Sequence, residues 1–148
     1  ATVNSIINVP TIYYGTQLDY NQTNPSTTSS NIATNNISQP LVDDEELKKL
    51  IMNQLEFYFS RENLSHDKYL VSQMDSDQFV PISILASFNM IRRLFARSKN
   101  SNLASSGVMI NERISFIANT VRLYFQLQQT QIQLDTNTGT KLKPPNAN

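Results

Sequence analysis

Apolar residues recur at steps of three and four in two segments of the chain, and each segment predicts an amphipathic helix. The first helix is expected over residues 44–59, where the acids from Asp43 to Glu46 supply N-cap candidates and suit the positive end of a helix dipole. Its apolar positions are Leu47, Leu50, Ile51, Leu55 and Tyr58. The second helix is expected over residues 82–95. Its apolar positions are Ile84, Leu85, Phe88, Ile91 and either Leu94 or Phe95.

Shorter elements are expected around these two helices. They are a break over residues 60–63, a short helix over 66–74 capped by Ser65, an extended segment over 79–81 and a weak helix over 103–111. The extended segment follows from Pro81, because proline pushes the residue before it out of the helical region. Alternation in Ile114–Ile117 and Val121–Phe125, around a short turn, predicts a β-hairpin. Helices followed by a hairpin are the order of elements in a winged-helix domain.

Two polar segments flank this region and set the expected domain limits. Residues 1–40 hold 22 Asn, Ser, Thr and Gln and one charge, Asp19, so they cannot bury enough apolar surface to offset the entropy of ordering. We predict a disordered segment over 1–40, a folded domain over 41–126 and a polar tail over 127–148. The apolar patch INVPTIYYG at residues 7–15 is a chance cluster, a short strand added to the domain or a docking motif for a partner.

Composition narrows the classes of function. The chain has 148 residues, no cysteine and a single histidine, His66. The lack of cysteine excludes disulfides, thiolate metal sites and cysteine catalysis, and we predict a non-enzymatic protein with no metal and no cofactor. No apolar run approaches the roughly 18–20 residues of a membrane span, so we expect no membrane partner and no small-molecule substrate. The start at Ala1, without methionine, predicts a fragment of a longer protein.

Charge is zero overall but unevenly distributed along the sequence. Residues 41–77 carry nine acids and four bases, whereas residues 78–148 carry eight bases and two acids. If the two halves fold together, one side of the domain can be electropositive, so zero net charge does not exclude nucleic acid. Four bases near the end of the second helix are either a solvated helix end or contacts for phosphate. They are Arg92, Arg93, Arg97 and Lys99.

The stretch NQLEFYFSRENLSHDKYL, residues 53–70, holds more aromatic side chains than one helix face can bury. Phe57, Tyr58 and Phe59 are consecutive, so on a helix their side chains point roughly 100° apart and cannot all face one core. At least one of them must be exposed or line a cavity. Tyr69 adds a fourth aromatic ten residues later.

Several short runs in and around this stretch keep a fixed spacing. They are Gln54–Ser60 (QLEFYFS), Asn63-Leu64, Asp67–Leu70 (DKYL), Met74-Asp75, Phe79–Ile82 (FVPI), Ala86–Phe88 (ASF) and Arg92–Leu94 (RRL). Together they closely resemble the La motif, the RNA-binding module of La and La-related proteins, over roughly residues 44–125. The resemblance implies an elaborated winged helix that holds the 3′ end of single-stranded RNA in a hydrophobic crevice.

The resemblance also implies roles for individual residues. Single-stranded RNA is recognised by bases that stack on aromatic faces, and the family's stacking positions are here Phe57, Tyr58, Tyr69 and Phe88. Gln54 matches an amide that reads a base edge, and Asp67 matches the acid that binds both hydroxyls of the terminal ribose. The simpler alternatives are that the aromatic rings pack in the core and that Gln54 and Asp67 are surface or helix-cap residues. Phe59 is assigned to the core.

Two positions depart from the family pattern. Phe57 stands where many relatives carry tyrosine, so stacking is kept while a hydroxyl contact is lost. Gln78 stands where glycine usually precedes Phe-Val-Pro. These departures leave the base preference and the shape of that turn open.

We therefore predict an α/β, mainly α, fold: an elaborated winged helix of the La type with a small β-hairpin wing and disordered polar tails. The predicted function is recognition of U-rich or A-rich single-stranded RNA 3′ ends by a cytoplasmic La-related protein that acts on mRNA stability or translation. Flanking segments are expected to meet mRNA-associated proteins. The alternatives are a genuine La-type chaperone of polymerase III transcripts, with a nuclear location, a winged helix whose crevice docks a peptide, and duplex DNA binding through residues 82–95.

Overall fold

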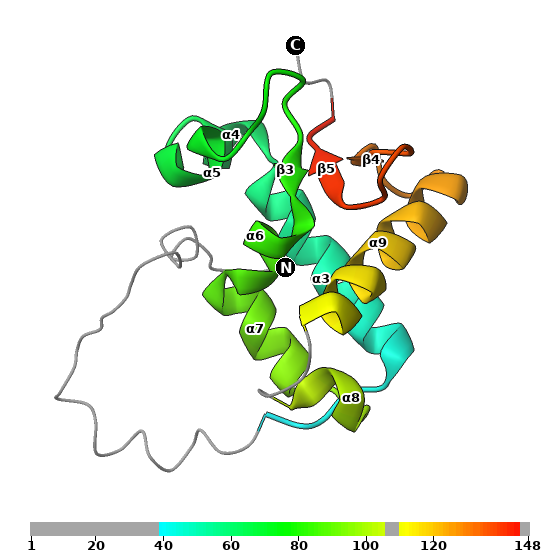
Figure 1. Ribbon diagram of the computed structural model, residues 1–148. Helices are drawn as coiled ribbons and strands as arrows, with labels where there is room; N and C mark the ends of the chain where they lie inside the picture. Colours follow the sequence, from blue (N-terminus) through cyan, green and yellow to red (C-terminus); the bar gives the residue numbers. More distant parts are fainter. Residues whose placement is uncertain (1–38, 106–109, 146–148) are drawn as a thin grey trace, which may run out of the picture.

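A computed structural model describes residues 39–105 and 110–145 (Figure 1). The helices are α3 Asp44–Tyr58, α4 Arg61–Leu64, α5 Lys68–Ser72, α6 Ile82–Ser87, α7 Asn89–Ala96, α8 Ser101–Ala104 and α9 Ile110–Gln126, and the strands are β3 Val80–Pro81, β4 Gln133–Leu134 and β5 Lys141–Lys143. The described chain is thus mainly helical with a small antiparallel sheet, as predicted. The disorder predicted for residues 1–40 falls almost wholly outside the described residues.

Helix α3 forms as predicted. Asp43 is its N-cap, and the carboxylate accepts a 2.9 Å hydrogen bond from the backbone N–H of Glu46. Three acids occupy the first turn, where negative charge is favoured. One face is buried in the core through Leu47, Ile51, Met52, Leu55 and Tyr58. Helices α7 and α9 pack against α3, and α6 packs against α7 and α9 (Figure 1).

The single helix expected over residues 82–95 is instead two helices, α6 and α7. The chain breaks at Phe88, whose backbone is extended (φ −68°, ψ 142°) and which ends one helix and begins the next. Of the predicted apolar positions, Leu85, Phe88 and Ile91 are buried, as are Leu94 and Phe95, whereas Ile84 is only partly buried. The break points the Phe88 ring toward α3, with its centroid 5.0 Å from that of Tyr58. Packing of this ring accounts for a kink that periodicity could not reveal.

The β-hairpin predicted over residues 114–125 is wrong, because these residues lie within α9. The buried side chains of α9 are Ile117, Ala118, Thr120 and Val121, which follow helical rather than alternating spacing. Packing against α6 and α3 overrides the β-propensity of the isoleucine, valine and aromatic residues. The segment ANT continues the helix and is not a turn.

The wing of the domain lies further along the chain, in the segment predicted to be a polar tail. Strands β4 and β5 are antiparallel, and β5 also pairs with β3, giving the strand order β3-β5-β4. Ile132 and Leu142 are completely buried. The folded domain therefore extends at least to residue 145, and the prediction of a tail is wrong for residues 127–145. Only residues 146–148 of that prediction lie outside the described residues.

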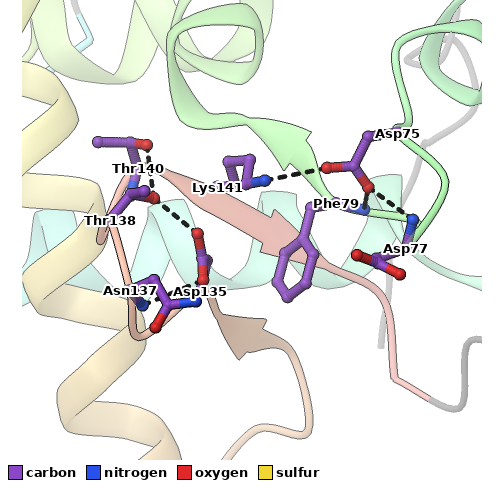
Figure 2. A network of polar contacts seen from close by, with 8 residues as sticks. All are labelled: Asp75, Asp77, Phe79, Asp135, Asn137, Thr138, Thr140 and Lys141. Carbon is purple, nitrogen blue, oxygen red and sulfur yellow. Dashed lines mark hydrogen bonds and ion pairs between the residues drawn. The ribbon is translucent and has the colours of Figure 1, made fainter.

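Polar contacts shape the wing at both edges (Figure 2). In the β4–β5 turn, the Asp135 carboxylate accepts from the Asn137 N–H and the Thr138 hydroxyl, and Gly139 takes a left-handed backbone (φ +69°). Across the sheet, Lys141 donates to the Asp75 carboxylate over 3.0 Å. The wing is thereby tied to the turn that precedes β3.

Two short helices connect α3 to β3. Ser60, expected to break the helix, is the N-cap of α4, and its hydroxyl accepts from the Asn63 N–H. The cap of α5 is Asp67 and not Ser65, so the helix expected over 66–74 is shorter than predicted. The weak helix expected over 103–111 is represented by the end of α8 and the start of α9, and residues 106–109 lie outside the described part.

Candidate functional site

The four aromatic residues singled out by the sequence lie in one cluster. The Phe57 and Tyr58 ring centroids are 6.2 Å apart, Tyr58 meets Phe88 edge-to-face at 5.0 Å, and Phe88 lies 6.1 Å from Tyr69. These rings come from α3, the α6–α7 junction and α5, three elements that the fold brings together. Phe59 is buried in the core, where the sequence placed it.

The rings differ strongly in exposure. Tyr58 and Phe88 are only 1% and 5% exposed, whereas Tyr69 is 50% exposed and Phe57 is half-buried. Tyr58 and Phe88 form the base of the cluster, so in this structure their faces are covered by protein. Tyr69 offers the largest open ring surface. Stacking by all four rings stays a prediction, and Tyr69 is the member available to a ligand without rearrangement.

Asp67 lies beside the cluster and is nearly buried, with 7% of its surface exposed. Its Oδ1 accepts a 2.9 Å hydrogen bond from the Leu70 N–H and so caps α5. Its Oδ2 accepts from the Asn63 side chain over 3.4 Å. The helix-cap role is therefore real, and it also fixes the orientation of the carboxylate. Each oxygen keeps lone pairs beyond these contacts, since a carboxylate can accept about four hydrogen bonds.

The sequence reasoning did not single out Asn63 as a site residue, yet Asn63 holds this corner together. Its amide nitrogen donates to the Tyr58 carbonyl over 2.9 Å as well as to Asp67. The residue is 4% exposed, and its Oδ1 is buried without a hydrogen-bond partner among the described residues. The available signal was the run Asn63-Leu64, which belongs to the short runs of fixed spacing in the sequence.

Gln54 stands next to the Tyr58 hydroxyl. Burial raises the pKa of Tyr58 above its ordinary value; the Gln54 side chain opposes this shift and the charge of Asp67 adds to it. Tyr58 is therefore neutral at any physiological pH. The Gln54 Nε2 is buried and finds no acceptor within residues 39–105 and 110–145. Such a donor is costly to leave unpaired, and an acceptor supplied by a ligand would satisfy it.

The four bases proposed for phosphate contact do not share one position. Arg92 and Arg93 are exposed on α7. The backbone N–H of Arg92 donates to the Phe88 carbonyl, so Arg92 follows Phe88 by one helical turn. Arg97 instead donates from Nε to the Pro40 carbonyl over 3.2 Å. Lys99 follows it, with its backbone N–H donating to the Val42 carbonyl. Arg93 lies in the last turn of α7 and Arg97 caps its end, while the charge of Arg92 acts on Arg113 of α9. Phosphate contact by these four bases stays a prediction.

Comparison with known proteins identifies the domain. A profile described as the La domain matches residues 51–105. La-related protein Larp4B of Drosophila melanogaster is 55% identical over 56 residues, and La-related protein 4 of Mus musculus is 56% identical over 57 residues. The chain carries the La motif of a La-related protein. The La-motif resemblance noted in the sequence is therefore confirmed.

The matched relatives are much longer than the La motif. The two alignments each cover 38% of this chain but only 4% of Larp4B and 8% of La-related protein 4. RNA-binding protein SRO9 of Saccharomyces cerevisiae is 39% identical over 56 residues, which are 37% of this chain and 13% of that protein. These alignments therefore identify the La motif and leave the activity of a whole protein to proposal.

Two further features of the La motif bear on its chemistry. Within residues 39–105 and 110–145, no group of three or more His, Cys, Asp or Glu side chains is placed to hold a metal ion. None of the helices in the same two ranges has the length and apolar character needed to cross a membrane. The La domain is a family of RNA-binding modules and not of enzymes, and RNA binding is the function that membership supports.

Proposed function

We propose that this La motif binds the 3′ end of single-stranded RNA at the cluster of Phe57, Tyr58, Tyr69 and Phe88, with Gln54 and Asp67 as its polar contacts. The observation that carries the proposal is the juxtaposition of a half-exposed ring, Tyr69, with a nearly buried carboxylate, Asp67. A base can stack on the ring while the adjoining ribose meets the carboxylate. Stacking on an aromatic side chain contributes about 1–3 kcal/mol per base.

The carboxylate gives a physical reason for selecting a free 3′ end. Asp67 can accept from two ribose hydroxyls, and it would repel a 3′ phosphate. DNA has no 2′ hydroxyl to donate, so the same group favours RNA. The hydrogen bond from Asn63 and the cap to Leu70 hold the carboxylate in place before RNA arrives, which lowers the ordering cost of binding.

The test is a fluorescence titration with oligo(U), oligo(A) and duplex DNA, each with a free and a phosphorylated 3′ end. Wild-type protein is expected to bind a single-stranded RNA with a free 3′ end best. Tyr69→Ala should weaken this binding about 5- to 150-fold, the range that one lost stack predicts. Phe125→Ala is the matched control, because Phe125 is exposed to a similar degree, 46%, on α9.

The role of Asp67 is tested with a substitution to asparagine rather than to alanine. Asparagine is also a good N-cap, so Asp67→Asn keeps α5 capped while removing the negative charge. We expect weaker binding of the free 3′ end and less discrimination against the 3′ phosphate. A variant that binds with full affinity and still rejects the phosphorylated oligomer would overturn the role of Asp67, and no detectable RNA binding by wild type would overturn the proposal itself.

The rival sites are less well supported by the geometry. Duplex DNA binding needs a recognition helix, but residues 82–95 are broken at Phe88, and α6 has six residues of which Ile82, Leu85 and Ala86 are buried. Docking of a peptide at the aromatic cluster would appear in the same titration as absence of nucleic-acid binding. A cytoplasmic role in mRNA stability or translation is proposed for the full protein, and crosslinking to RNA in cells would separate mRNA from polymerase III transcripts.

A further inference from the structure

A concave surface lies between α4, α5 and the segment after β5, and its lining residues differ from those of the aromatic cluster. This groove encloses about 680 Å³ and is lined by Glu56, Phe59, Ser60, Arg61, Leu64, Ser65, Val71, Met74, Gln78, Pro144 and Pro145. None of its residues belongs to the proposed RNA set. Val71 is exposed on α5, so this short helix presents Tyr69 to the cluster and Val71 to the groove.

The chemistry of the groove favours a polypeptide over RNA. Phe59, Leu64, Val71 and Met74 are apolar, and two prolines complete the wall. Arg61 and Glu56 are its two charged residues, so it lacks the excess of positive charge on which phosphate binding depends. A groove of this kind suits a short segment with apolar side chains.

The two charged side chains of the groove differ in whether they already have a partner. The Glu56 carboxylate already accepts a hydrogen bond from the Thr130 hydroxyl. Arg61 is exposed and has neither a hydrogen-bond nor an ion-pair partner for its guanidinium within the described parts of the chain. A segment that binds in the groove should therefore contribute one carboxylate to pair with Arg61, beside apolar or aromatic groups.

The first 38 residues of this chain contain one segment of that composition. Residues 6–20, IINVPTIYYGTQLDY, hold most of the apolar residues that precede the domain, and Asp19 is the single charge in residues 1–40. Asp19 stands between Leu18 and Tyr20. Asp19 thus carries the charge opposite to that of Arg61. Leu18 and Tyr20 supply the apolar and aromatic groups that suit the apolar wall of the groove.

The tether is long enough for this segment to reach the groove. The described chain begins beside α8, while the groove lies at the other end of the domain, near α4 and α5 (Figure 1). Gln39 lies 20 positions after Asp19. This stretch spans up to about 70 Å when extended, roughly twice the diameter expected for a domain of about 100 residues. A tether of this length gives an effective concentration in the millimolar range, so weak contacts suffice.

We infer that residues 6–20 dock in this groove of the same molecule, with Leu18 and Tyr20 against the apolar wall and Asp19 paired with Arg61. The La motif would then hold its own N-terminal segment on a face separate from the RNA site. The inference does not depend on RNA binding, because it uses neither the aromatic cluster nor Asp67.

The test uses the full 148-residue chain, which has no cysteine of its own. A nitroxide is attached to Gln17→Cys, and the methyl signals of Met74 and Met90 are compared by NMR. Met74 lines the groove, whereas Met90 lies on α7 outside it. We expect the label to broaden Met74 more than Met90, and a label at Ser29→Cys to lack this preference.

Charge exchange then tests the pairing. Arg61→Glu and Asp19→Arg should each lower the ratio of docked to undocked chain about two- to fivefold, the effect of one exposed ion pair, and the double variant should restore it. Lys68→Glu is the control, since Lys68 is an exposed base of α5 that does not line the groove. Because Arg61 is exposed, its replacement should leave the fold intact, which the unchanged spectrum of Met90 verifies.

Several outcomes would overturn the inference. Equal broadening of Met74 and Met90 would show that the segment does not dock. Broadening seen in a mixture of nitroxide-labelled and isotope-labelled copies would assign the groove to a second copy of the chain. Shifts of Met74 on addition of oligo(A), without any effect of the label, would assign it to RNA.

Discussion

The aromatic cluster and the wing are both held to the core by apolar side chains, but their polar contacts lie in different surroundings. At the cluster, Asn63 and Asp67 are buried and hydrogen-bond to each other beneath the rings. At the wing, the contact between Lys141 and Asp75 lies at the surface (Figure 2). A buried polar group that loses its partner keeps its full desolvation cost, whereas an exposed group finds water. Polar substitutions should therefore affect stability at the cluster and only weakly at the wing.

The largest expected effect is at the base of the cluster. Phe88→Ala should lower the free energy of unfolding by about 3–5 kcal/mol, because it removes a buried ring and leaves a cavity beside Tyr58. Urea denaturation measures this difference. Tyr69→Ala in the same cluster should change stability by less than about 0.5 kcal/mol, because its ring is half exposed. Equal losses for the two variants would remove the distinction between the base and the open face.

A somewhat smaller effect is expected at the buried side chain of the wing. Leu142→Ala should cost about 2–5 kcal/mol, because Leu142 is completely buried between β3 and β4. A polar tail would show no such effect, so denaturation of this variant tests the corrected domain limit directly. Leu127→Ala is the control, since Leu127 is exposed in the same C-terminal region.

The polar contacts of the cluster should come next. Asn63→Ala is expected to cost about 1–3 kcal/mol, because it leaves the Tyr58 carbonyl without its donor and frees one side of Asp67. Asn137→Ala, in the exposed β4–β5 turn, should be nearly neutral, since that residue contributes its backbone N–H to Asp135. A neutral Asn63 variant would indicate that water replaces the lost contacts.

The smallest effect is expected at the surface pair of the wing. The Phe79 N–H, and then Lys141, hold the pKa of Asp75 below its ordinary value of 3.8, and Asp75 raises the pKa of Lys141 above 10.5. The lowered pKa of Asp75 stabilises the fold above pH 3.8, and this stabilisation is lost as the pH falls through the pKa of the folded state. The raised pKa of Lys141 stabilises the fold below pH 10.5, and this stabilisation is lost at higher pH.

Asp75→Asn should therefore lower the thermal midpoint slightly between about pH 5 and pH 9, and the difference from wild type should shrink outside that window. Added salt should reduce it as well, because the pair is exposed. Asp77→Asn provides a control in the same turn. A difference that persists at pH 2 would show that the carboxylate charge is not its cause.

The sequence predicted the first half of the domain better than the second for a physical reason. Helix α3 has fifteen residues, a clear N-cap and an uninterrupted apolar stripe, so local signals suffice. Strands β4 and β5 have two and three residues, which is too short for any period to show. The turn from Asp135 to Gly139 was the available signal for the wing. In α9, Ile110, Ile114, Ile117 and Val121 follow helical spacing, while local alternation in the same segment favours a strand.

The sequence predicted that the four aromatic rings lie together, but it did not predict how exposed each ring is. The resemblance to the La motif implied that Phe57, Tyr58, Tyr69 and Phe88 lie together. The distances between the ring centroids agree with this expectation. Which ring remains open depends on the break at Phe88 and on the position of α5. Both are set by packing between segments far apart in the sequence, so no local pattern carries them.

Gln78 shows how two demands on one residue compete. Its backbone is left-handed (φ 73°), which costs a residue with a side chain about 1 kcal/mol relative to glycine. The same side chain lines the groove between α4 and α5. A change to glycine would thus relax the turn and at the same time remove part of the groove wall. The position is therefore a trade-off between backbone strain and surface chemistry.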